Sequence, residues 1–161
     1  MTKSGLGMLA TAALATASSA PAESPLPLWQ GVTRIGIACL VNTDHGVDTG
    51  ALRDRLCTRV RTLVAAGAPV PVDSVRIGDP AIADAHHLNL LVHASTGGTP
   101  GGRMMAISIR SYRNIEGNGQ LFGAEPRVVA TAASDADLDA ALKVPLGQML
   151  PWRSNGAGRL R

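Results

Sequence analysis

Residues 32–41 have the sequence VTRIGIACLV, an apolar run that a threonine and an arginine interrupt only near its start. A run without regular polar alternation is typical of a central strand that is covered on both faces. The turn-forming sequence NTDHG follows at residues 42–46. We therefore expect the fold to begin with a buried strand that ends in a turn.

A helix is expected over residues 48–66, because apolar side chains recur there on one arc at helical spacing. Those side chains are Leu52, Leu56, Val60, Leu63 and Val64. Gly67 follows the last of them and can end the helix. The first two elements are therefore a strand and a helix that packs on it.

The rest of the chain predicts further strands and a second helix. Strands are expected over residues 72–77, 88–95, 103–113 and 120–132, the last with a weak point at Pro126, and a short helix over residues 81–87. Ser134 can begin the second helix, which Pro145 should end or kink. The order β-α-β-(α)-β-β-β-α predicts an α/β (α+β) fold, with one mixed sheet of about five strands and helices mainly on one face.

The first 22 residues have the features of a cleavable secretion signal. Lys3 precedes an uncharged apolar stretch over residues 6–17, and small residues lead to an expected cleavage between Ala22 and Glu23. The apolar stretch is shorter than the about 20 residues that a membrane span needs, which disfavours an uncleaved anchor. We expect a periplasmic or secreted protein with an extended leader over 23–31, one domain over 32–152 and a flexible tail over 153–161.

Composition and motif spacing exclude several classes of partner and cofactor. The chain has four aromatic residues and a formal net charge of +3. Proteins that bind nucleic acids usually have aromatic platforms or a dense basic stripe, so no nucleic-acid partner is expected. No spacing matches a standard zinc site, phosphate loop or nucleophile elbow. We therefore expect no metal and no cofactor, and no stable membrane insertion after signal cleavage.

The sheet face that points away from the helices is the candidate binding surface. If Val92 and Ile107 contact the helices, the alternate residues of the same strands point away from them. The residues predicted for this polar face are Arg76, Asn89, His93, Ser108, Arg110, Tyr112 and Arg127. Such a surface could accept carboxylates or an acidic partner. The simpler interpretation is the solvated face of a two-layer sheet.

The two cysteines, Cys39 and Cys57, allow two interpretations. An oxidising compartment permits a disulfide between them. However, a helix axis lies about 10 Å from the sheet it covers, whereas bridged Cα atoms lie within about 7 Å. The sequence slightly favours two buried free thiols and leaves the disulfide open.

The layout of residues 33–142 resembles that of the N-terminal domain of TolB and of related CsgG-type envelope modules. The similar features are the segments IGIA (35–38), ADAHH (83–87), LLV (90–92), GG (101–102), RSY (110–112) and DL (137–138). The resemblance implies a non-catalytic interaction module of the bacterial envelope, with another envelope protein as its partner.

Three functions stay open at this point. The leading hypothesis is an exported, non-catalytic interaction module of the cell envelope. The second is a small secreted hydrolase-like enzyme in which His93 works with a nearby serine or aspartate. The third is an oligomeric structural component built from copies of this chain.

Overall fold

A computed structural model of the chain describes residues 27–43, 49–115 and 118–153. The predicted signal, its cleavage site between Ala22 and Glu23, and the predicted tail from residue 154 onward lie outside these residues. Within the described part, no helix is long and apolar enough to cross a membrane.

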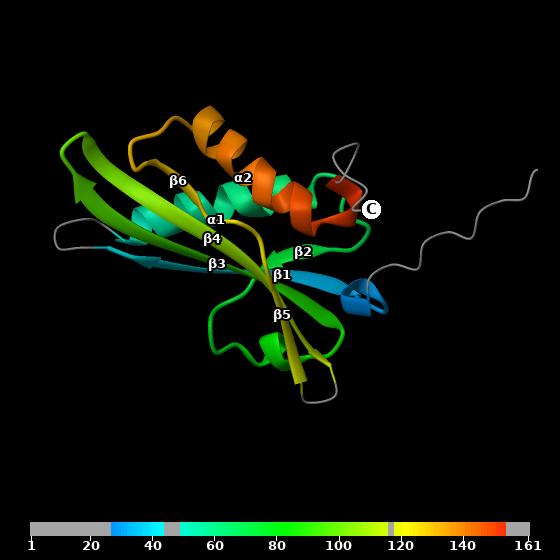
Figure 1. The fold of residues 1–161 in the computed structure, drawn as a ribbon. Helices are drawn as coiled ribbons and strands as arrows, with labels where there is room; N and C mark the ends of the chain where they lie inside the picture. Colours follow the sequence, from blue (N-terminus) through cyan, green and yellow to red (C-terminus); the bar gives the residue numbers. More distant parts are fainter. Residues whose placement is uncertain (1–26, 44–48, 116–117, 154–161) are drawn as a thin grey trace, which may run out of the picture.

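The described chain forms one mixed sheet with two helices on one of its faces, so the predicted fold class is confirmed (Figure 1). The strands are β1 (Arg34–Asn42), β2 (Val72–Ser74), β3 (His87–Thr99), β4 (Gly102–Ile115), β5 (Asn118–Gly123) and β6 (Arg127–Ala130). The helices are α1 (Thr49–Ala65) and α2 (Asp135–Met149), with 3-10 turns η1 (Pro27–Trp29), η2 (Pro80–Ala83) and η3 (Pro151–Arg153). The strand order is β2-β1-β3-β4-β5, with β6 also paired to β4. β1 is parallel to β2 and β3, and the other pairs are antiparallel.

The core lies between the sheet and the two helices, as the apolar patterns predict. Ile35 and Ile37 of β1 are fully buried on the helix side. Gly36 and Ala38 alternate with them and are also buried, so the first half of β1 is covered on both faces. From α1, residues Leu56, Val60, Leu63 and Val64 enter the same core. β1 is therefore the central strand that its near-continuous apolar run predicts.

Helix α2 begins at the predicted cap and continues through the proline that was expected to end or kink it. The hydroxyl of Ser134 accepts a hydrogen bond from the backbone N–H of Asp137 at 3.2 Å. The helix continues past Pro145, which is buried within it, to Met149. Pro145 thus does not end α2, because packing of the helix on the sheet outweighs the missing backbone hydrogen bond.

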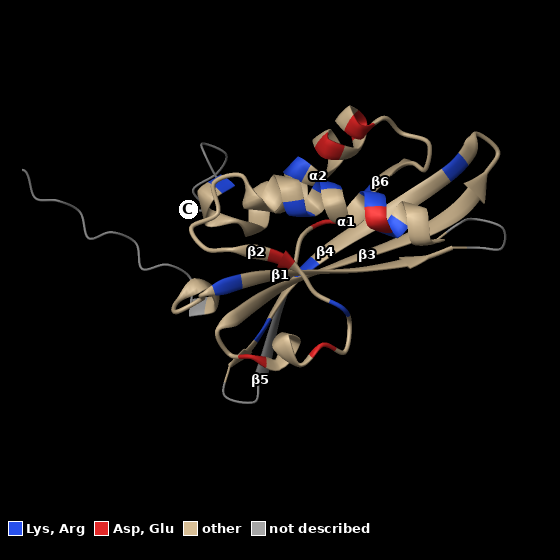
Figure 2. Cartoon of the chain, turned by 180° about the vertical axis from the view of Figure 1, so that it is seen from behind, with Lys and Arg blue, Asp and Glu red and all other residues tan. Residues whose placement is uncertain are grey.

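Ion pairs join the first turns of α2 to α1, and Figure 2 shows the acidic residues where α2 begins. Arg55 contacts Asp135 at 2.7 Å, and Arg59 makes a bidentate hydrogen bond with Asp139. The hydrogen bond from Arg59 holds the pKa of the Asp139 carboxyl below its usual value. These contacts fix the two helices side by side over the sheet.

The predicted fifth strand is divided into β5 and β6 by a bulge at residues 124–126. Arg110 of β4 pairs with Gly123, but Ile107 pairs with Arg127. Residues 108–109 of β4 therefore lie opposite residues 124–126, one more residue than regular pairing would place there. One extra residue turns every later side chain of that strand to the opposite face.

The last residues of the predicted leader belong to the domain rather than to an extended segment. Residues 27–29 form η1, and Leu28 is buried. The guanidinium of Arg113 donates hydrogen bonds to the carbonyl oxygens of Leu28 at 2.9 Å and of Ala85 at 2.6 Å. The ring of Trp29 packs edge-on against that of Trp152, with their centroids 5.0 Å apart. Arg113 therefore ties the start of the domain to the middle of the chain.

Cys39 and Cys57 form a disulfide between β1 and α1, with their Cα atoms 5.9 Å apart. The expectation that slightly favoured free thiols was wrong. It used a general distance from the sheet to the helix axis, but a Cα on the sheet-facing side of a helix lies about 2.3 Å nearer to the sheet, and α1 approaches β1 at Cys57 more closely than that general distance. Cys57 lies on that side of α1, within reach of Cys39.

Candidate functional site

The candidate site is the sheet surface opposite α1 and α2, which we call the open face. Its side chains come from neighbouring strands in one register, in which Leu40 pairs with His93, His93 with Ser108, and Ala106 with Val128. The open face consists of Leu40, Leu91, His93, Met104, Ala106, Ser108, Arg110, Tyr112 and Val128.

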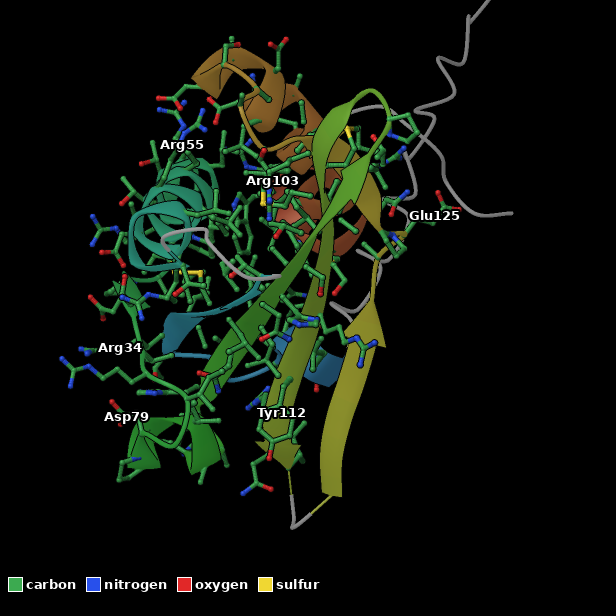
Figure 3. All side chains as sticks on the ribbon, turned by 90° about the vertical axis from the view of Figure 1, so that its left-hand side faces the viewer. Arg34, Arg55, Asp79, Arg103, Tyr112 and Glu125 are labelled. Carbon is green, nitrogen blue, oxygen red and sulfur yellow. A yellow bond between two sulfur atoms is a disulfide. The ribbon has the colours of Figure 1, made fainter. Side chains whose placement is uncertain are left out.

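Four of the predicted binding residues lie together on this face. His93 and Ser108 are direct partners on β3 and β4, Leu91 stands opposite Arg110, and Tyr112 lies one step further along β4. Figure 3 shows Tyr112 at the end of β4 nearest η2. The strand alternation therefore predicted the placement of these residues, and their role in binding stays a prediction.

Asn89 points to the same side of the sheet but is not accessible. Its side chain is completely buried beneath the segment that contains η2. Its Nδ2 donates a hydrogen bond to the carbonyl oxygen of Ile82 at 3.2 Å, and Asn114 donates to that of Ala83 at 2.9 Å. Asn89 thus holds the covering segment on the sheet, and the open face begins beyond it.

The covering segment is stabilised by carboxylates at both ends of η2. Asp79 accepts a hydrogen bond from the backbone N–H of Ala81 at 2.9 Å. Asp84 accepts one from the backbone N–H of His86 at 2.7 Å, and this hydrogen bond lowers the pKa of the Asp84 carboxyl. These local bonds shape the η2 segment, which Asn89 and Asn114 hold over one end of the sheet, and the described residues leave the other end uncovered (Figure 1).

Arg127 and Arg76 do not join the open face, which corrects two of the predicted positions. Arg127 pairs with Ile107 and therefore points to the helix side, where its Nε is buried. The bulge causes this, because regular pairing would have turned Arg127 outward. Arg76 lies outside the strands, in the segment that follows β2.

The sequence patterns missed the apolar part of the open face. Val128 is 62% exposed and Leu40 is 44% exposed. Val128 points outward because of the bulge, so the sequence carried no local signal for its exposure. For Leu40, the position in an apolar run suggested burial on both faces, but Leu40 is exposed and no described segment covers this end of β1.

The surroundings of His93 do not assemble a catalytic pair among the described residues. Its Nε2 lies 2.9 Å from the side-chain nitrogen of Asn42. The hydroxyl of Ser108 donates to the backbone carbonyl oxygen of His93 at 3.5 Å, not to the ring. Across residues 27–43, 49–115 and 118–153, no group of three histidine, cysteine or acidic residues could hold a metal ion. This arrangement gives no support to the hydrolase hypothesis.

The charge of the open face is positive, because it carries Arg110 but no acidic residue. On the same side of the sheet, Arg34 and Asp73 neutralise each other at 3.2 Å across β1 and β2. Glu125 extends from the outer edge of the sheet, between β5 and β6 (Figure 3). The open face therefore combines exposed apolar side chains with a small excess of positive charge.

Comparisons with known proteins find a likeness in structure only. Two structures of the PelC dodecamer from Paraburkholderia phytofirmans, one of them a point variant, are 9% identical to this chain. Their TM-scores are 0.44 for the variant and 0.46 for the other, over 80% of this chain and 91% and 92% of theirs. No protein-family model matches the chain, and no curated protein matches its sequence. A likeness at this level says nothing about the assembly or the activity of this chain.

Proposed function

We propose that this protein is an exported, non-catalytic interaction module that binds an acidic protein of the cell envelope through its open face. The observation that carries the proposal is the exposure of Leu40 and Val128 on the same face as Arg110, a face whose residues include no acidic one. The signal-like first 22 residues support export. The role also agrees with the one implied by the resemblance to the N-terminal domain of TolB.

The exposed apolar side chains support a protein partner. Exposed apolar groups that lie together on one surface are typical of interaction sites. Leu40 lies on β1 and Val128 on β6, so they frame the uncovered strands of the face, and Ala106 is exposed beside Val128. Covering them would remove apolar area from water, which is the main driving force of most protein association.

The charge of Arg110 specifies the chemistry of the partner. Arg110 can form a bidentate pair with a carboxylate, and such pairs favour one partner and orientation over others. Because the face itself carries no carboxylate, the complementary surface should supply the acidic groups. A patch of apolar side chains edged by aspartate or glutamate would fit both features.

A photoreactive amino acid at Val128 or Ala106 tests this proposal in cells that produce the full chain. The matched control carries the same amino acid at Ala140, an exposed position on α2. We expect one discrete adduct from both open-face positions, with a different protein as its second component, and none from Ala140. The variant Arg110→Glu should reduce the adduct about tenfold without changing the thermal unfolding temperature.

An adduct that contains two copies of this chain would overturn the proposal in favour of an oligomeric structural component. Equal labelling from Ala140 would refute a role of the open face, as would the lack of any adduct. The mass of the mature protein tests export separately, because the chain should begin at Glu23.

A further inference from the structure

A second surface with recognisable chemistry is a groove of about 650 Å³ beside β1. One wall is α1, which contributes Thr49, Arg53, Asp54, Cys57, Thr58 and Arg61. The other wall is residues 74–77, which end β2 and follow it, and the floor is residues 39–41 of β1. His93, Arg110 and Val128 do not line this groove, and Leu40 is the one residue of the open face that does, so the two surfaces adjoin at Leu40.

The α1 wall is a single stripe of the helix. Arg53, Cys57 and Arg61 recur every four residues and therefore lie above one another on one helix face. The disulfide from Cys57 to Cys39 attaches the middle of this stripe to the floor of the groove. The stripe thus keeps a fixed position beside β1.

The groove has an excess of positive charge. Arg53 pairs with its neighbour Asp54 at 3.0 Å, which neutralises one arginine. Arg61 and Arg76 are exposed and form no ion pair within residues 27–43, 49–115 and 118–153. In contrast, Arg59 faces α2, where Asp139 holds it. Figure 2 shows basic positions on α1 and on the segment that leaves β2.

The floor of the groove is an unpaired edge of β1. The N–H of Ile35 donates to the carbonyl oxygen of Pro71, and the carbonyl oxygen of Ile37 accepts from the N–H of Val75. Because backbone groups alternate along a strand, those of Cys39 and Val41 point to the same edge. β2 ends at Ser74, and no described residue pairs with this edge beyond Ile37. Figure 1 shows β1 continuing past the end of β2.

We propose that this groove binds an extended acidic peptide segment, which adds to the free edge of β1 as a strand. The backbone groups of Cys39 and Val41 would pair with the peptide backbone, as in other cases of strand addition. Side chains of an added strand alternate between the two faces of the sheet. Carboxylates of the peptide would meet Arg61 on the α1 wall and Arg76 on the wall that follows β2.

The edge of β1 and the two arginines together favour a peptide over a small anion. A small anion would use the arginines but would leave the backbone groups of the edge unpaired. An exposed strand edge with unpaired backbone groups is a template for another strand. The two arginines then select acidic sequences, because opposite charges across an interface suppress the wrong partners.

The direct test measures binding of a fluorescent peptide of about six residues, which alternates threonine and glutamate. Fluorescence anisotropy is recorded with the full chain and with the variant Arg61→Glu/Arg76→Glu. The control peptide has lysine in place of glutamate, and a third peptide has N-methylated backbone nitrogens with the same charges. The variant Arg110→Glu serves as a protein control, because it changes the open face and leaves the groove intact.

We expect the acidic peptide to bind, and the lysine peptide to bind at least about tenfold more weakly. The double charge reversal should weaken the acidic peptide by a similar factor, whereas Arg110→Glu should leave its affinity unchanged. If the double variant unfolds, Arg61→Gln/Arg76→Gln replaces it, with an expected loss of several-fold.

Three results would overturn the proposal. Equal affinity of the full chain and the double variant would show that the arginines do not select the ligand. Unchanged binding of the N-methylated peptide would show that no strand is added. Binding of inorganic phosphate without binding of the acidic peptide would assign the groove to small anions. None of these results affects the crosslinks expected from Val128, so the two proposals fail independently.

Discussion

Replacing Gly36 by alanine tests how the two faces of β1 are packed. A Cβ at this position would lie 2.5 Å from Oδ1 of Asn89 and 3.0 Å and 3.1 Å from the two methyl carbons of Val75. Asn89 is fully buried, and its Nδ2 donates to the carbonyl oxygen of Ile82. The added methyl group must therefore displace the side chain that holds the η2 segment on the sheet.

The cost follows from two effects of similar size. Overpacking a well-packed site costs about 1–3 kcal/mol. If Asn89 moves instead, its buried amide loses a hydrogen bond, at about 1–3 kcal/mol. The smaller conformational freedom of alanine in the unfolded chain offsets about 0.4–1 kcal/mol of this. We expect Gly36→Ala to destabilise the domain by about 2 kcal/mol, which lowers the Tm by roughly 6–10 °C.

Thermal and urea unfolding, followed by circular dichroism with the disulfide intact, measure this effect. The control is Gly97→Ala on β3, where an added Cβ meets no atom within 4 Å. Its stability should change by at most about 0.5 kcal/mol. A second comparison repeats Gly36→Ala in a protein that carries Asn89→Ala, which removes the blocking oxygen.

The double-mutant comparison decides whether the contact with Asn89 is the cause. In the Asn89→Ala background, Gly36→Ala should cost at least about 1 kcal/mol less than in the original chain. The reasoning would be refuted if Gly36→Ala cost less than about 0.5 kcal/mol, or cost the same in both backgrounds.

Two further predictions concern the disulfide and an ion pair between the helices. Replacing Cys39 and Cys57 together by alanine should destabilise the domain by about 3 kcal/mol, because the bridge closes a loop with a sequence separation of 18; an unchanged urea midpoint would contradict this. The hydrogen bond from Arg59 lowers the pKa of the Asp139 carboxyl in the folded state. Ionised Asp139 therefore stabilises the folded domain fully above its unfolded pKa of about 3.9, and this contribution is lost as the pH falls through the folded pKa. Asp139→Asn should therefore reduce the loss of stability in acid unfolding below about pH 4, and an unchanged acid transition would count against the pair.

The elements of the fold were predictable because their patterns are local. The apolar run at residues 32–41 indicated a central strand, and the helical arc through Leu56 and Val60 indicated α1. Alternation in β3 and β4 placed His93, Ser108 and Arg110 on one side of the sheet. Each of these predictions needs only the side-chain period of one helix or strand.

The details of the open face were not predictable because they depend on pairing between strands. The bulge at residues 124–126 turned Arg127 inward and Val128 outward. The covering of Asn89 depends on where the η2 segment packs, and nothing within β3 indicates it. Pro126 indicated a weak point in the strand. It did not indicate that an extra residue there would turn the following side chains to the opposite face of the sheet.

The amino-acid sequence alone determined which segments form strands and helices and which of their sides are apolar, because these properties repeat along a single segment. Only the tertiary structure decided that β2 ends at Ser74, so that no described residue pairs with this edge of β1 beyond Ile37. It also brought Arg61 and Arg76 to the same groove and Cys57 within bonding distance of Cys39. These features depend on two segments of the chain at once: the register between two strands, the point where their pairing ends, and contacts between residues far apart in the sequence. No pattern within one segment determines them.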